Sequence, residues 1–259
     1  MALVVRDVSD GICTLTLNDP DRLNAMGEEM AQEFAEVVRG LKNSDKTFRS
    51  IILTGAGRAF SAGGNLEMLK AKTMLSPEEN RLRMLAFYNS FLSIRDLNVP
   101  LIAAINGHAI GAGLCVACAC DIRVISRSAK LGFTFTKLGL HPGMGATWFL
   151  PNVIGSSRAI ELMLTGRIVV GEEVESLGLA ARVVEEAKVL ETSRDIASQI
   201  KECGPEATRQ LLETLRSGSA SLEQSLGREA TCQSLNYKSD EFLEGVQATI
   251  EKRKPLFAH

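Results

Sequence analysis

The sequence predicts an α/β protein in which helices pack on a core of short strands. Short β-type runs, glycine-bearing loops and helical patterns follow one another around residues 51–70, and again around residues 101–119. After about residue 195 the pattern is almost purely helical. Strands alternating with helices are typical of an α/β core. We therefore expect a core region at residues 1–195 and a helical region at residues 196–259.

The chain begins with a predicted β-hairpin. Residues 3–8 and 12–17 alternate in polarity, and Ser9-Asp10-Gly11 supplies residues that accept the backbone conformation of a tight turn. Asn18-Asp19-Pro20-Asp21 then ends the second strand. From Gly27 to about Leu41 apolar residues recur at helical spacing, which predicts an amphipathic helix.

The middle of the chain supplies the repeated strands. Runs at residues 50–54 and 100–105 are predicted strands, each followed by a glycine loop and a helical pattern. A long helix is expected at residues 74–95, which include the helix-start signature Ser76-Pro77-Glu78-Glu79. Residues 121–126 and 131–135 read as further short strands.

Four helices are expected in the C-terminal region. Their predicted ranges are residues 192–202, 205–217, 221–236 and 240–252. Helices too few to bury their own apolar faces often pack on a neighbouring subunit, so we expect a homo-oligomer.

Composition excludes several classes of protein. The chain has 259 residues, of which 45% are hydrophobic, and its 29 basic and 31 acidic residues give a net charge of −2. Nothing in this balance favours a nucleic-acid or membrane-surface partner. The longest apolar stretch, residues 101–120, is interrupted by Asn106, His108 and three glycines. Met1 leads directly into a strand-like segment and the six cysteines form no disulfide-like framework, so a reduced, cytoplasmic setting is expected.

The two glycine loops carry the strongest chemical signal. They span residues 59–66 and 106–113, and each connects a strand to a helix. Such turns expose backbone N–H groups, and the start of a helix adds partial positive charge. Two of them facing one another would form an oxyanion hole, which stabilises an oxygen that becomes negative during a reaction. Either loop alone would more simply be a tight turn.

The ordered set of motifs resembles the crotonase, or enoyl-CoA hydratase/isomerase, superfamily over nearly the whole chain. The motifs that carry the resemblance are Asn18-Asp19-Pro20, Leu23-Asn24-Ala25-Met26, Ile52-Leu53-Thr54-Gly55, residues 59–66, residues 99–107, Cys120-Asp121-Ile122-Arg123, residues 138–143, Leu164-Thr165-Gly166 and residues 252–257. The resemblance implies a spiral of ββα units with a helical trimerisation region, assembled as a homotrimer or homohexamer. It also implies a coenzyme A thioester as substrate, with no metal or redox cofactor.

The resemblance implies particular site residues. The oxyanion donors would be the backbone N–H groups of Gly64 and Ala112. Arg22 and Arg58 would meet the phosphates or adenine of coenzyme A, although solvated surface charge explains both arginines equally well. The remaining implied contacts are backbone at Leu23, Ala25, Ala62 and Leu66, and, in a neighbouring subunit's site, Lys254 and Phe257. For Phe257 a core or subunit contact is the simpler alternative.

The sequence departs from the family at its acid–base residues. The two positions where hydratases of the family carry glutamates hold Cys115 and Phe135, and a third carboxylate position falls at Gly143. All three would line the acyl site without supplying a carboxylate. Cys115 is interpreted as a small buried hydrophobe, and the cysteines at 115, 118 and 120 have no nearby fourth ligand for zinc. Glutamate-dependent hydration is therefore not expected.

Other side chains near the loops could replace the carboxylates. His141 is the best candidate for acid–base work, the alternative being an ordinary loop histidine. Asn65 replaces a frequent acidic residue and is expected to form a local hydrogen bond. We interpret the chain as an enzyme that stabilises the enolate of an acyl-CoA or an acyl-carrier-protein thioester. The alternatives are a decarboxylase of a β-carboxyacyl thioester and a non-catalytic member that binds acyl-CoA or RNA.

Overall fold

The computed structural model describes residues 1–43 and 48–257, so residues 44–47 and 258–259 of the two expected regions lie outside the described part. Its order of elements is β1 (Val4–Ser9), β2 (Ile12–Leu17), α1 (Glu28–Lys42), β3 (Ser50–Gly55), β4 (Ala59–Ser61), α2 (Leu66–Ala71), α3 (Pro77–Leu92), β5 (Leu101–Ile105), β6 (His108–Ile110), α4 (Ala112–Ala119), β7 (Ile122–Ser126), β8 (Leu131–Gly132), α5 (Ala146–Ile154), α6 (Ser156–Thr165), β9 (Ile168–Val169), α7 (Glu172–Ser176), β10 (Arg182–Val184), α8 (Val189–Lys201), α9 (Pro205–Ser217), α10 (Leu222–Asn236) and α11 (Asp240–Glu251).

Two sheets form the centre of the molecule. The larger has the order β1-β2-β3-β5-β7-β10, and the smaller has the order β4-β6-β8-β9. Three successive strand pairs, β3/β4, β5/β6 and β7/β8, each place their first strand in the larger sheet and their second in the smaller. Strands from β2 to β10 in the larger sheet run parallel. This repeated two-sheet connection confirms the predicted α/β fold built from ββα units.

The core lies on both faces of the larger sheet. In β3, Ile51 and Leu53 belong to the main cluster with α1, α3 and α4, whereas Ile52 faces the cluster formed with α8. Alternate strand residues point to opposite faces, so a strand covered on both faces is apolar throughout. Helix α8 therefore belongs to the packing of the sheet, and position 195 falls inside this helix. The predicted boundary between two regions stays a prediction.

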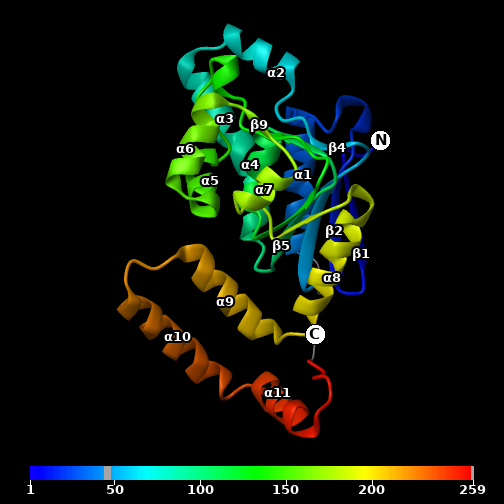
Figure 1. Ribbon diagram of the computed structural model, residues 1–259, viewed down its shortest axis with the longest axis vertical. Helices are drawn as coiled ribbons and strands as arrows, with labels where there is room; N and C mark the ends of the chain where they lie inside the picture. Colours follow the sequence, from blue (N-terminus) through cyan, green and yellow to red (C-terminus); the bar gives the residue numbers. More distant parts are fainter. Residues whose placement is uncertain (44–47, 258–259) are drawn as a thin grey trace.

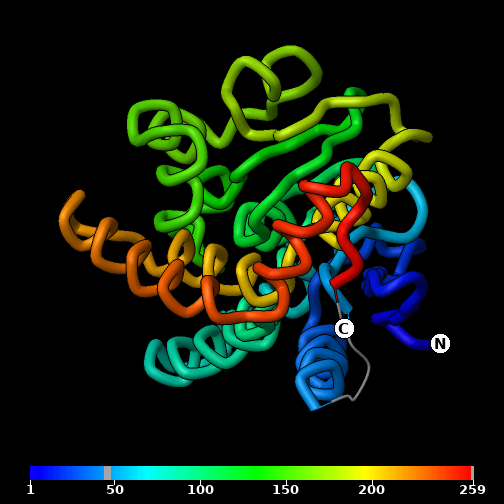
Figure 2. Tube along the Cα trace, turned by 90° about the horizontal axis from the view of Figure 1, so that it is seen from below, coloured from blue at the N-terminus to red at the C-terminus, as the bar shows by residue number. Residues whose placement is uncertain are grey.

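Helices α9 to α11 lie beside the body of the molecule. In Figure 1 they form a separate group below the sheets, and Figure 2 shows them in orange and red crossing under the core. Arg216 of α9 joins this group to the core, because its guanidinium binds Asp121 with Nε–Oδ1 and Nη2–Oδ2 distances of 2.9 and 2.6 Å. Within the described residues, no helix is both long and apolar enough to cross a bilayer.

Most predicted elements agree with the structure to within a few residues. The hairpin turn has Asp10 and Gly11 at φ 52° and 70°, as a two-residue turn of this type requires. The helix expected at residues 74–95 begins only at Pro77, because Ser76 and Glu79 form a capping box, and it ends at Leu92 before a 3-10 turn. The strands β4 and β6, which lie inside the two predicted glycine loops, were not predicted, and neither were α5, α6, α7, β9 and β10.

The strand predicted at residues 131–135 is wrong beyond Gly132. Only Leu131 and Gly132 pair with neighbouring strands. Phe135 has helical backbone angles of φ −56° and ψ −47°, and a 3-10 turn follows at Thr136–Leu138. The chain therefore leaves the smaller sheet early, and Phe135 faces a cavity rather than a strand neighbour.

Candidate active site

The first glycine loop connects β4 to α2. Asn65 begins the helix, and its side-chain oxygen accepts a hydrogen bond from the Met68 N–H at 2.9 Å, which confirms the expected local bond. Gly63 has a φ of 89°, and a Cβ there would lie 2.5 Å from the carbonyl oxygen of Ile110. Only glycine fits at position 63, because both the backbone angle and the contact exclude a side chain.

The second glycine loop connects β6 to α4. Gly111 adopts φ 52° and ψ −121°, a conformation that L side chains rarely adopt, and Ala112 is the first residue of α4. A Cβ at Gly113 would lie 2.7 Å from the Cβ of Ser61, and a Cβ at Gly63 would lie 3.4 Å from the Ala112 nitrogen. The two loops are therefore in direct contact.

Two backbone amides at this contact lack a protein acceptor. The neighbouring Gly63, Asn65 and Gly111 N–H groups donate to Ser61 Oγ, Met26 O and Gly132 O at 3.1, 3.0 and 2.8 Å. Among the described residues, no acceptor is found for the N–H groups of Gly64 and Ala112. Backbone donors away from bulk water are nearly always paired. These two are therefore available to a ligand.

Gly64 and Ala112 line one cavity of about 790 Å³. This volume is typical of a site for a small molecule. Of the residues predicted for the site, the cavity brings together Arg22, Ala25, Ala62, Gly64, Asn65, Leu66, Ala112, Phe135 and His141. The lining residues absent from the predicted site are Glu67, Met68, Leu69, Lys72, Asn80, Met84, Phe87, Tyr88, Ile110, Gly111, Thr134, Leu138, Leu140 and Met144.

Helix α3 supplies much of the lining that sequence reasoning missed. Asn80, Met84, Phe87 and Tyr88 recur at the spacing of one helix face, and all four line the cavity. This spacing is a signal that the sequence contains. The sequence does not indicate that the face borders a cavity rather than the core.

None of the three positions that the family resemblance assigns to carboxylates carries a charged acid or base. Cys115 is fully buried in α4, and this burial raises the pKa of its thiol well above the usual value, so the thiol stays protonated. Phe135 presents a hydrocarbon ring, and Gly143 has no side chain. Among the described residues, no cluster of histidine, cysteine and carboxylate side chains could hold a metal ion.

His141 lies at the exposed edge of the cavity. Its Nδ1 is 2.7 Å from the carbonyl oxygen of Pro142. A carbonyl only accepts hydrogen bonds, so Nδ1 is the donor in this contact. Its part in acid–base chemistry stays a prediction.

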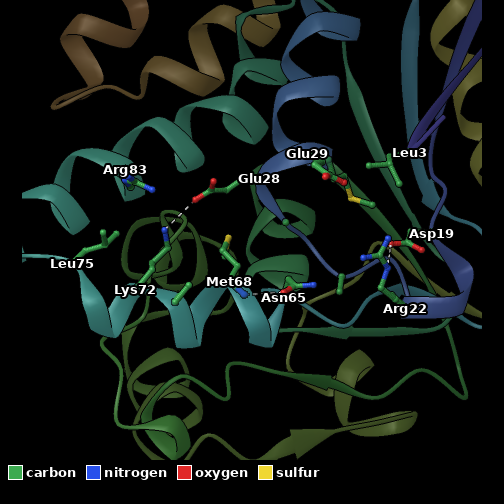
Figure 3. Close-up of a pocket in the computed structure, with 14 residues that line it drawn as sticks. Leu3, Asp19, Arg22, Glu28, Glu29, Asn65, Met68, Lys72, Leu75 and Arg83 are labelled. Atoms are coloured by element: carbon green, nitrogen blue, oxygen red, sulfur yellow. Dashed lines mark hydrogen bonds and ion pairs between the residues drawn. The ribbon is translucent and has the colours of Figure 1, made fainter. Parts of the chain in front are cut away.

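A second cavity of about 420 Å³ adjoins the first and shares with it Arg22, Ala25, Asn65, Met68 and Lys72. Lys72 pairs with Glu28 at 3.5 Å, and Arg22 pairs with Asp19 at 2.9 Å. Figure 3 shows how these four side chains lie along the cavity. Arg83 also lines this cavity. Asp19, Glu28 and Glu29 line the same cavity, so its three cations and three carboxylates balance in charge.

The remaining predicted residues do not line the main cavity. Leu23 lies behind the first loop, where its carbonyl oxygen accepts the Ala62 N–H at 2.9 Å, and Arg58 is exposed. Cys115 and Gly143, which were expected to line the acyl site, are not among the lining residues. Lys254 pairs with Glu202, and Phe257 lies near Gly245 in a cavity of the C-terminal helices. A role of Lys254 and Phe257 in a neighbouring subunit's site stays a prediction.

Comparison with known proteins identifies the family and the fold of the chain. The chain matches the family described as enoyl-CoA hydratase/isomerase over residues 7–259. It is 34% identical to the 1,2-epoxyphenylacetyl-CoA isomerase of Escherichia coli K12, with 99% of this chain and 98% of that protein covered. The crystal structure of an enoyl-CoA hydratase from Bacillus anthracis superposes with a TM-score of 0.91 at 32% identity, covering 98% of both chains. An enoyl-CoA hydratase from Polaromonas sp. JS666 gives 0.92 at 30%, covering 98% of this chain and 99% of that one. This chain is therefore an enzyme of the enoyl-CoA hydratase/isomerase family and has the crotonase fold.

Proposed function

We propose that this enzyme binds an acyl-CoA thioester in the 790 Å³ cavity and stabilises the enolate of its acyl group. The single observation that carries the proposal is the pair of unpartnered amides at Gly64 and Ala112 in that cavity. Two donors converging on the thioester oxygen would stabilise the negative charge that develops there. The same geometry would serve an acyl-carrier-protein thioester.

The lining gives each part of the substrate a place. The acyl chain would lie among Met84, Phe87 and Phe135, which are apolar. The nucleotide end of coenzyme A would extend toward Arg22, Lys72 and Arg83 in the adjoining cavity. Guanidinium and ammonium groups recognise phosphate by charge-assisted hydrogen bonds.

A second candidate function follows from the missing carboxylates. Removal of an α-proton requires a base, and the three family positions offer none. Loss of CO₂ from a β-carboxyacyl thioester produces the same enolate without a base. Because Cys115, Phe135 and Gly143 supply no base, decarboxylation is the specific reaction that we propose as the second candidate.

Acetoacetyl-CoA provides a direct test of enolate stabilisation, since its enolate absorbs in the near ultraviolet and its keto form does not. We expect the bound ligand to show the enolate band at a pH where the free ligand is mainly the keto form, because the two amides lower the pKa of the bound thioester. Coenzyme A alone is the control. Tight acetoacetyl-CoA binding without the enolate band would contradict the proposal and would favour a non-catalytic acyl-CoA-binding role.

We also propose a homotrimer or homohexamer. The support is the row of exposed apolar side chains on α9 to α11, a large uncovered apolar surface for a single subunit. These side chains are Leu211, Leu215, Leu222, Leu226, Leu235, Phe242, Leu243, Val246 and Ile250. Sedimentation velocity is expected to give three or six times the 28.0 kDa chain mass. A monomer at micromolar concentration would contradict this expectation.

A further inference from the structure

Tyr88 is a half-buried residue of α3 that lines the main cavity. Within the part of the chain that the structure describes, its hydroxyl forms no hydrogen bond, although the ring packs against the main core. The hydroxyl oxygen is not among the fully buried unpaired polar atoms of the described residues, so it opens onto the cavity. Its O–H is therefore available as a donor to a group on a bound ligand.

The position of the hydroxyl is defined by its contact with Gly143. A Cβ built on Gly143 would lie 2.3 Å from Tyr88 Oη and 2.8 Å from Cζ. The hydroxyl thus occupies the space into which any side chain at position 143 would extend. A residue from α3, 55 positions earlier in the chain, places a polar group where the family resemblance puts a third carboxylate.

The surroundings of this hydroxyl determine whether it acts as a proton donor or as a base. Met84, Phe87 and Phe135 line the cavity with it. Burial raises the pKa of Tyr88 above its usual value. A phenol that resists ionisation is a poor base but can still protonate an enolate carbon, whose conjugate acid is far weaker. Tyr88 is therefore suited to donate a proton.

We propose that Tyr88 is the proton donor to the α-carbon of the enolate, and that the enolate arises by loss of CO₂ from a malonyl-type thioester, in which the carboxylate is attached to the α-carbon. This inference rests on the proposed stabilisation of the enolate at Gly64 and Ala112. The bond between the α-carbon and the carboxylate breaks, its electron pair enters the enolate, and CO₂ leaves. The α-carbon then forms a bond to the Tyr88 proton, and water reprotonates the phenolate. No oxidant, reductant or further co-reactant is needed.

Methylmalonyl-CoA in D₂O tests the assignment, because protonation of its enolate creates a labelled stereocentre in propionyl-CoA. We expect wild type to release CO₂ and to place deuterium on one face of the α-carbon. Tyr88→Phe is expected to form product about 10²-fold more slowly and to label both faces, because a positioned acid contributes a factor of this order. Tyr237→Phe changes the other tyrosine of the chain, which packs on Phe242 of the C-terminal helices, and is expected to behave as wild type.

Two outcomes would overturn the inference. One is the same rate and the same labelled face in Tyr88→Phe as in wild type, with both proteins shown to be folded by thermal unfolding. The other is the absence of CO₂ release from methylmalonyl-CoA and malonyl-CoA by wild type. If acetoacetyl-CoA still shows the enolate band, the failure belongs to the assignment of Tyr88 and its substrate class. If the band is also absent, the proposed function fails with it.

Discussion

Ala112→Pro is expected to lower kcat on the acyl-CoA substrate by about 10²–10³, the usual effect of losing one oxyanion donor. Proline has no backbone N–H, so the substitution removes the main-chain donor at position 112, which other amino acids would retain. Ala112 is the first residue of α4, where proline is well tolerated because that N–H has no partner within the helix. The variant should therefore fold, and the loss of the N–H donor should appear as a lower kcat.

The matched control is Ala112→Gly, which keeps the N–H and changes only a methyl group. It is expected to remain within about tenfold of wild type, since the catalytic donor is preserved. Steady-state kinetics with methylmalonyl-CoA and the enolate band of bound acetoacetyl-CoA are the two measurements. Equal activity of the proline and glycine variants would exclude the Ala112 amide as an oxyanion donor.

The local signals in the sequence were sufficient for most of the fold. The hairpin turn at Asp10-Gly11 and the capping box at Ser76 depend only on residues close in sequence, and both signatures are found in the structure. The strand predicted at residues 131–135 failed because Phe135 adopts a helical conformation that its neighbours Thr134 and Thr136 do not indicate. Tertiary context decided that segment.

The site was predictable where backbone conformation defines it. Glycines at positions 63 and 111 are required by positive φ angles, and this requirement is visible as a glycine pattern. Tyr88 could not be found in the same way. Its contact with Gly143 brings α3 together with a loop 55 residues later in the chain. The sequence of neither segment indicates that the two will meet. Residues brought together by tertiary packing need the structure.

Arg216→Ala is expected to have the largest effect on stability, lowering the free energy of unfolding by about 3–5 kcal/mol. Arg216 and Asp121 form an ion pair in which the side chains are only 13% and 17% exposed. The guanidinium also donates to the carbonyl oxygens of Arg95, Leu97 and Val99 at 3.0–3.2 Å. Alanine would leave one carboxylate and three carbonyls without this donor, at the junction between α9 and the core.

Arg228→Ala is the matched control, because Arg228 pairs with Glu213 at 3.3 Å in an exposed setting. Its effect is expected to stay below about 1 kcal/mol, as is usual for surface ion pairs. Arg216→Lys should recover only part of the loss, since an ammonium cannot reproduce the two-point contact with Asp121. Urea unfolding followed by circular dichroism measures all three variants. If Arg216→Ala and Arg228→Ala shift the midpoint equally, the Asp121 contact does not anchor α9, and the apolar surface of the C-terminal helices must be held in place by other contacts.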